Sequence, residues 1–153
     1  MTRIEHSVLI ERPVEEVWDY LMDATNNPVW QGPVIEARAG AELEVGSRID
    51  EVMQFLGRRV EVTWEVTELE PLRRSAVRTA SGPVPMHGGY TLEPVGGSTR
   101  FTMDSELEAH GFFKLAEPVF ARMARREGVT SCETLKDVLE ARGSGSGATN
   151  GAP

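Results

Sequence analysis

Cysteine is nearly absent from this chain. The 153 residues include one, Cys132, so no disulfide can form within the chain. A chain of this length buries enough apolar surface to fold around a core without cross-links or metals. A lone thiol fits a reducing compartment, and we expect a single soluble domain in the cytoplasm.

Long apolar runs are also absent. No stretch approaches the roughly 18 uninterrupted apolar residues that a membrane span requires. The first residues, MTRIEHSVLIERP, alternate in polarity and carry charges, so they lack the apolar core of a signal peptide. We therefore expect neither membrane insertion nor secretion.

Positive charge and histidine are scarce. The 16 basic residues are outnumbered by 24 acidic ones, which gives a formal net charge of -8. The negative electrostatic potential of such a protein repels a phosphate backbone, so nucleic acid is excluded as a partner.

The three histidines, His6, His87 and His110, lack the spacing of a metal site, and no C-x-x-C pair exists. We predict no metal and no cofactor.

The most informative segment that the chain does contain is a strand followed by two short helices. A strand ends at Ile10, and Pro13 stands where a helix can begin. From Val14 to Met22 the apolar residues recur at three- and four-residue spacing, which predicts an amphipathic helix. A second short helical segment is expected from Asn26 to Gln31.

Alternation of apolar and polar residues predicts a run of strands around and after these helices. Turn signals at short intervals favour an antiparallel meander with Val34–Ala39 at an edge. The expected strands are Arg3–Ile10, Val34–Ala39, Ser47–Leu56, Arg59–Glu68, Arg73–Ser81, Val84–Glu93 and Thr99–Glu108.

The strand Ser47–Leu56 is ambiguous in its register. We place Ile49, Glu51, Met53 and Phe55 on the inner face, because this set carries the bulkier side chains. A slip of one residue would turn Glu51 outward, so its placement depends on this choice.

A long helix is expected from Phe112 to Ala141, packed against the concave face of the sheet. Cys132 is expected to point away from its inner side. The inner side of the helix is expected to carry Phe113, Ala116, Phe120, Met123, Leu135 and Val138, with Glu127, Ser131 and Thr134 beside them.

Residues 143–153 contain no large apolar side chain, so we predict a domain of residues 1–142 followed by a disordered Gly/Ser-rich tail.

Several segments, in this order, resemble the SRPBCC (START-like, helix-grip) superfamily, in its bacterial polyketide cyclase/dehydrase branch. The resemblance covers nearly everything from Ile4 to Leu139. The segments that carry it are IERPVEEVW (10–18), NPVW (27–30), EVGSR (44–48), FLGRRVEVTWEVTELEP (55–71), SGPVP (81–85) and YTLEPVGGSTRFT (90–102).

The resemblance implies an α+β helix-grip fold, in which a curved antiparallel sheet wraps around a long C-terminal helix, with two short helices after the first strand. It also implies a deep apolar pocket between the sheet and that helix. Members of the superfamily include aromatase/cyclases, lipid and hormone carriers, and proteins that assist folding or ribosome function. The fold alone therefore does not fix the function. No cyclase catalytic signature transfers to this chain residue by residue.

Large apolar side chains on the inner faces are candidates for the wall of such a pocket, since aromatic and methionine side chains adapt to a hydrophobic ligand. The alternative is that they simply fill the core. The ligand-binding candidates are Trp30, Met53, Phe55, Val62, Trp64, Tyr90, Phe101, Met103, Phe113, Phe120 and Met123, together with Ser131 and His6.

Polar residues on these inner faces are the candidates for chemistry. Glu51 and Glu127 share no inner face with an arginine, and a carboxylate buried without a cation has a raised pKa. Either carboxylate would then suit a general acid or base, with Tyr90 holding a developing oxyanion. The alternatives are structural: Glu127 lies at a water-filled pocket mouth, and His6 is a core or edge histidine.

Three functions follow from these observations. The first is a protein that binds a hydrophobic polyketide-, lipid- or terpenoid-like molecule, as a carrier or a polyketide cyclase-like protein. The second is a cofactor-independent cyclase or dehydratase that uses a buried carboxylate. The third is a protein-interaction module. The sequence is compatible with a monomer or a homodimer, and it leaves enzyme status open.

Overall fold

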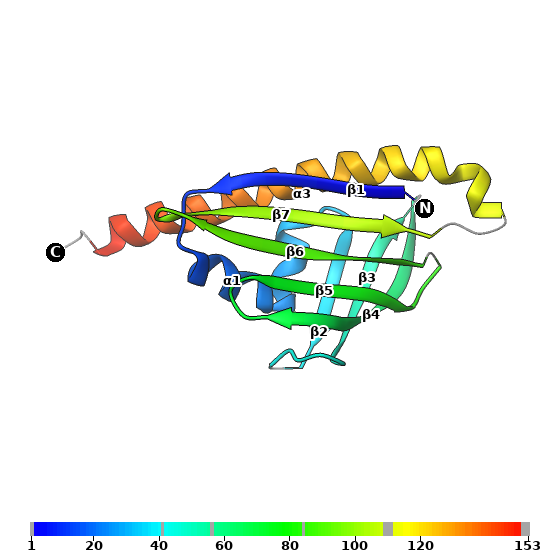
Figure 1. Cartoon of the computed structure of the whole chain (residues 1–153), viewed down its shortest axis with the longest axis horizontal. Coiled ribbons are helices and arrows are strands. Elements are labelled where there is room, and N and C mark those ends of the chain that lie inside the picture. The colour runs from blue at the N-terminus through cyan, green and yellow to red at the C-terminus, as the bar shows by residue number, and fades with distance from the viewer. Residues whose placement is uncertain (1, 41, 56, 84, 109–111, 151–153) are drawn as a thin grey trace.

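The core of the fold is a single antiparallel sheet. The computed structural model describes residues 2–40, 42–55, 57–83, 85–108 and 112–150. Its seven strands lie in the order β1-β7-β6-β5-β4-β3-β2 (Figure 1), so β2 to β7 form a meander and β1 pairs with β7. The predicted meander and the edge position of β2 are confirmed. The strands are β1 Thr2–Ile10, β2 Val34–Ala39, β3 Arg48–Phe55, β4 Arg58–Glu70, β5 Arg74–Ser81, β6 Met86–Val95 and β7 Ser98–Leu107.

Short helices follow β1 directly, as the sequence predicts. The helix α1 (Val14–Met22) begins after Pro13, and it buries Val17 and Leu21 against the sheet, where it contacts β6 and β7. A 3₁₀ turn, η1 (Ala24–Asn26), leads into α2 (Asn27–Trp30). These elements cover one end of the concave face of the sheet.

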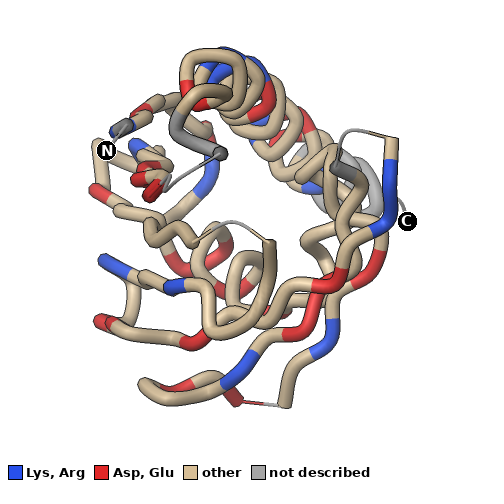
Figure 2. The backbone as a smooth tube through the Cα atoms, turned by 90° about the vertical axis from the view of Figure 1, so that its right-hand side faces the viewer, with Lys and Arg blue, Asp and Glu red and all other residues tan. Residues whose placement is uncertain are grey.

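The long helix α3 (Phe112–Asn150) contacts β1 most extensively and also reaches β7 and α2. Figure 2 shows α3 at the top, with the strands curving away beneath it. The helix-grip architecture, a curled sheet closed by a long C-terminal helix, is therefore confirmed.

The buried face of α3 differs from the expected one at Cys132. This side chain is fully buried in the core together with Leu135 and Leu139, so the expectation that it points away is wrong. At about 100° per residue, the buried side chains of Ala121, Cys132 and Leu139 point within roughly 20° of one another. The buried face is therefore centred on these residues, to one side of the predicted stripe, whose Met123 is 37% exposed. Leu135 and Val138 lie on the buried side as predicted.

The helical backbone of α3 continues to Asn150, beyond Arg142. The division of the chain into a domain of residues 1–142 and a disordered tail of residues 143–153 stays a prediction.

The strand β3 has the predicted register, in which the face with the bulkier side chains is turned inward. Ile49 and Glu51 are buried, whereas Asp50 between them is exposed. Glu51 pairs with Val62 of β4, which is also buried. The inward placement of Glu51 is therefore confirmed, and a one-residue slip is excluded.

Two adjacent glycines bring β6 very close to its neighbours. A Cβ atom on Gly88 would collide with the backbone of Asp104 in β7, and one on Gly89 would collide with the backbone of Ser75 in β5. Only glycine fits at such close approaches. Gly88 shares the inner face of β6 with Met86 and Tyr90, so β6 projects no side chain into the cavity between those two residues.

Candidate functional site

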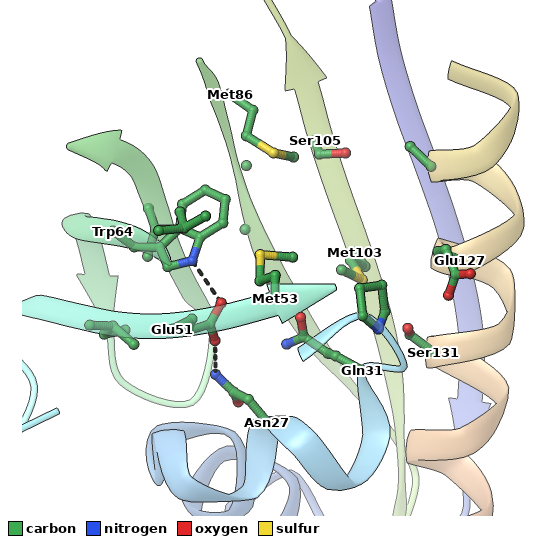
Figure 3. Close-up of a pocket in the computed structure, with 18 of the residues that line it drawn as sticks. Asn27, Gln31, Glu51, Met53, Trp64, Met86, Met103, Ser105, Glu127 and Ser131 are labelled. Atoms are coloured by element: carbon green, nitrogen blue, oxygen red, sulfur yellow. Dashed lines mark hydrogen bonds between the residues drawn. The ribbon is translucent and has the colours of Figure 1, made fainter. Parts of the chain in front are cut away.

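A cavity of about 320 Å³ lies between the concave face of the sheet, the short helices and α3 (Figure 3). Most of its wall is apolar. Many of the side chains expected on a pocket wall border it: Met53, Val62, Trp64, Tyr90, Met103, Phe120, Met123 and Ser131, with Glu51 and Glu127. That these residues bind a ligand stays a prediction.

Trp30 and Phe101 are expected on the cavity wall. In the structure they lie instead in the core behind Tyr90. The ring of Trp30 is 5.6 Å from that of Tyr90 and 6.0 Å from that of Phe101, measured between centroids. Both side chains are fully buried, because α1 and α2 cover this end of the sheet. Their packing holds the ring of Tyr90, which does border the cavity.

His6 also lies away from the cavity wall. It is half-buried on the inner face of β1, opposite Met103, and its Nε2 has no hydrogen-bond partner among the described residues. His6 does not line the cavity, because α3 packs along β1 and separates this strand from it, and a ligand contact by His6 stays a prediction. The side chains of Phe55 and Phe113 lie outside the part of the chain that the structure describes.

Glu51 is the most deeply buried charged group in the cavity, with 5% of its surface exposed. The indole Nε1 of Trp64 donates a hydrogen bond to its Oε1 at 2.7 Å, and the Nδ2 of Asn27 donates one to its Oε2 at 2.9 Å (Figure 3). Burial raises the pKa of Glu51, and the two hydrogen bonds only partly oppose that shift. None of the described residues that line the cavity is a lysine or an arginine.

Tyr90 carries the second polar group of interest. The Nε2 of Gln31 donates to its hydroxyl oxygen at 2.9 Å, which leaves the phenolic hydrogen free to donate. Burial raises the pKa of Tyr90, and the nearby charge of Glu51 raises it further. The phenol is therefore protonated at neutral pH and acts as a hydrogen-bond donor in the same cavity as Glu51.

Asn27 and Gln31 were missed as site residues. They lie four residues apart at the two ends of α2, so both amides reach the sheet from one side of this short helix. The spacing itself was the available signal, but their partners are 24 and 59 residues away in the chain.

Glu127 lies at the mouth of the cavity rather than inside it. Its side chain is exposed, and its Oε2 would lie 3.3 Å from a Cβ atom placed on Gly32. Its position fits the alternative of a carboxylate at the pocket mouth, and a role for Glu127 as general acid or base stays a prediction. The neighbouring Ser131 is buried, as is Cys132, whose pKa is raised by burial to about 12. That thiol is not an activated nucleophile.

The model of one protein family, described as "Polyketide cyclase / dehydrase and lipid transport", matches residues 1–140. The chain belongs to this family. Among curated proteins, none matches the sequence.

Solved structures share the fold of this family member at low sequence identity. TTHA0849 from Thermus thermophilus superposes with a TM-score of 0.79 at 17% identity, over 92% of this chain and 99% of that one. The ZhuI aromatase/cyclase from Streptomyces sp. R1128 gives a TM-score of 0.78 at 18% identity, over 92% and 94%. A START superfamily protein from Mycobacterium smegmatis gives 0.67 at 16% identity, over 92% and 95%. These likenesses confirm the fold that the START-like resemblance implies.

Membrane spans and metal clusters are absent from the described ranges of this polyketide cyclase/dehydrase family member. None of the helices in those ranges combines the length and apolar character needed to cross a bilayer. Within the same ranges, no group of three or more His, Cys, Asp or Glu side chains is placed to hold a metal ion.

Replacing Glu51 with Gln is expected to stabilise this family member at pH 8. Because the folded-state pKa of Glu51 is raised, ionisation destabilises the folded protein above that pKa, and the penalty disappears below the ordinary glutamate pKa of about 4.3. An uncharged isostere removes the penalty, so we expect a gain of about 1 kcal/mol, or roughly 2–4 °C in Tm, at pH 8 and little gain near pH 4. Thermal unfolding at the two pH values measures this.

The matched control is Glu61→Gln, which removes a charge from the exposed outer face of β4. It is expected to change Tm little at either pH. A loss of stability in Glu51→Gln at pH 8 would mean that the bonds from Asn27 and Trp64 to the ionised carboxylate outweigh its burial.

Proposed function

We propose that this protein binds a hydrophobic small molecule, polyketide-, lipid- or terpenoid-like, inside the cavity between the sheet and α3. The observation that carries the proposal is the cavity of about 320 Å³ with its mainly apolar wall. This volume falls in the range of sites for small organic ligands, which are typically concave and apolar with a few polar groups. The family description, which names polyketide cyclases and lipid transport, supports the same class of ligand.

The methionines of the wall also support a carrier or cyclase-like role. Met53, Met86 and Met103 converge on the cavity from three strands (Figure 3). Unbranched thioether side chains adapt to irregular ligand shapes at little cost. The cavity therefore accepts an apolar skeleton without requiring one rigid shape.

A cofactor-independent cyclase or dehydratase is the second candidate, favoured by the pairing of Glu51 with Tyr90 in one cavity. The carboxylate of Glu51 would remove a proton from the carbon next to a ligand carbonyl, and the electron pair would move onto the carbonyl oxygen. The phenolic hydrogen of Tyr90 would stabilise that oxyanion. Ring closure or loss of water would follow, with protonated Glu51 returning its proton.

Titration with Nile red, an uncharged lipophilic dye, tests the proposed binding. We expect saturable binding of one dye per chain, with enhanced and blue-shifted emission, because the dye moves from water to an apolar cavity. An emission that stays at its aqueous value throughout the titration would argue against the proposal. For the enzymatic alternative, Glu51→Gln should still bind the dye while any turnover falls by about 10²–10⁴-fold.

A further inference from the structure

The charges around the cavity are of one sign. Its described lining includes three acidic residues, Glu51, Glu127 and Asp104, and no lysine or arginine. The Asp104 carboxylate is neutralised by Arg74, whose Nη1 lies 2.6 Å from its Oδ2. His87 also borders the cavity, but its exposed side chain lies 3.0 Å from the Glu106 carboxylate. The uncompensated charge that faces a ligand is therefore negative.

Glu51 can accept more hydrogen bonds than the protein gives it. Each carboxylate oxygen has two lone pairs, and the side-chain bonds from Trp64 and Asn27 use one on each oxygen. The indole of Trp64 can only donate, so it fixes Oε1 as an acceptor in either protonation state of Glu51. Because Glu51 lines the cavity, its remaining acceptor capacity suits a donor on the ligand.

From this arrangement we infer that the cavity selects an apolar ligand that is uncharged or cationic and donates an O–H or N–H hydrogen bond to Glu51. The inference rests on the proposed binding function and specifies its ligand class. A carboxylate or phosphate amphiphile would bring a second negative charge beside a buried one, with no basic side chain in the described lining to compensate it. An ether or hydrocarbon would leave the carboxylate without the donor that completes its hydrogen bonding.

Four probes with the same dodecyl chain separate these requirements: dodecylamine, dodecanol, dodecyl methyl ether and dodecanoic acid. Each is used to displace Nile red at pH 7.5, below the concentration at which it forms micelles. We expect the amine and the alcohol to compete at concentrations at least roughly tenfold below those of the ether and the acid, since a site built to accept a hydrogen bond discriminates against ligands that lack the donor.

Two variants assign this selectivity to Glu51. In Glu51→Gln the amide can donate to an anion, so the acid should gain at least about tenfold in affinity relative to the amine. Glu61→Gln makes the same change of charge on the outer face of the neighbouring strand and should leave the order of the four probes unchanged.

The outcomes distinguish this inference from the proposed function. If Nile red binds and dodecanoic acid displaces it as well as dodecanol does, the ligand class is wrong while the binding function stands. The ligand class is also wrong if Glu51→Gln and Glu61→Gln shift the order equally. If neither Nile red nor any of the four probes binds, the proposed function itself fails and the inference fails with it.

Discussion

Ser105→Phe is expected to weaken Nile red binding by at least about tenfold, which corresponds to ~1.4 kcal/mol of binding free energy. Ser105 faces the cavity from β7 and pairs with Gly88 of β6, where no side chain opposes it (Figure 3). A phenyl ring there has room to fold into the cavity and occupies the space that the ligand needs. Fluorescence titration of the variant against the unmodified protein measures the effect.

The control is Ser7→Phe. Ser7 is an exposed serine on the outer face of β1, the strand next to β7, so the same substitution is made on the opposite side of the sheet. Its dye affinity should match that of the unmodified protein. Equal binding by both variants would mean that the dye occupies a site other than this cavity.

Trp30→Ala is expected to have the largest effect on stability. The side chain is 1% exposed and packs against the rings of Tyr90 and Phe101, so its removal leaves a hole in the core. Truncation of a buried tryptophan costs roughly 3–5 kcal/mol, which lowers Tm by about 6–20 °C for a chain of this size. Thermal unfolding by circular dichroism measures the loss.

Val29→Ala serves as the control, since Val29 is the neighbouring residue in α2 and its side chain is 57% exposed. It should change Tm by no more than about 2 °C. Trp30→Phe should recover part of the lost stability and retain dye binding, because it keeps an aromatic ring behind Tyr90. A stable Trp30→Ala variant that had lost dye binding would instead place Trp30 on the cavity wall.

The placement of Glu51 shows which part of this site a sequence can predict. Alternation along β3 is a local pattern, and the bulk of Ile49 and Met53 decided which face is buried. Glu51 follows from that choice because residues two apart share a face. The face of a strand was therefore predictable.

Which part of that inner face borders the cavity and which part lies in the core was not predictable. Phe101 and Met103 share the inner face of β7, yet Phe101 is in the core and Met103 borders the cavity. The difference arises from α1 and α2, which cover only one end of the sheet. Trp30 is buried for the same reason, and a pattern along the chain carries no information on where a helix ends on a sheet.

The hydrogen-bonding partners were the least predictable feature. Asn27 reaches Glu51, and Gln31 reaches Tyr90, only because α2 is placed over β3 and β6 by the tertiary fold. Glu127 shows the same limit on α3, since the helical pattern placed it on this side of the helix but left open whether it lies inside the cavity or at its mouth.

Native mass spectrometry of the protein purified from its own producing organism tests the central claim, that the cavity holds a hydrophobic small molecule, most directly. We expect a fraction of the protein to carry one bound molecule per chain, released by organic solvent, and we expect Ser105→Phe to lose it while Ser7→Phe retains it. Protein that is free of any bound molecule, together with no binding of added Nile red, would contradict the claim.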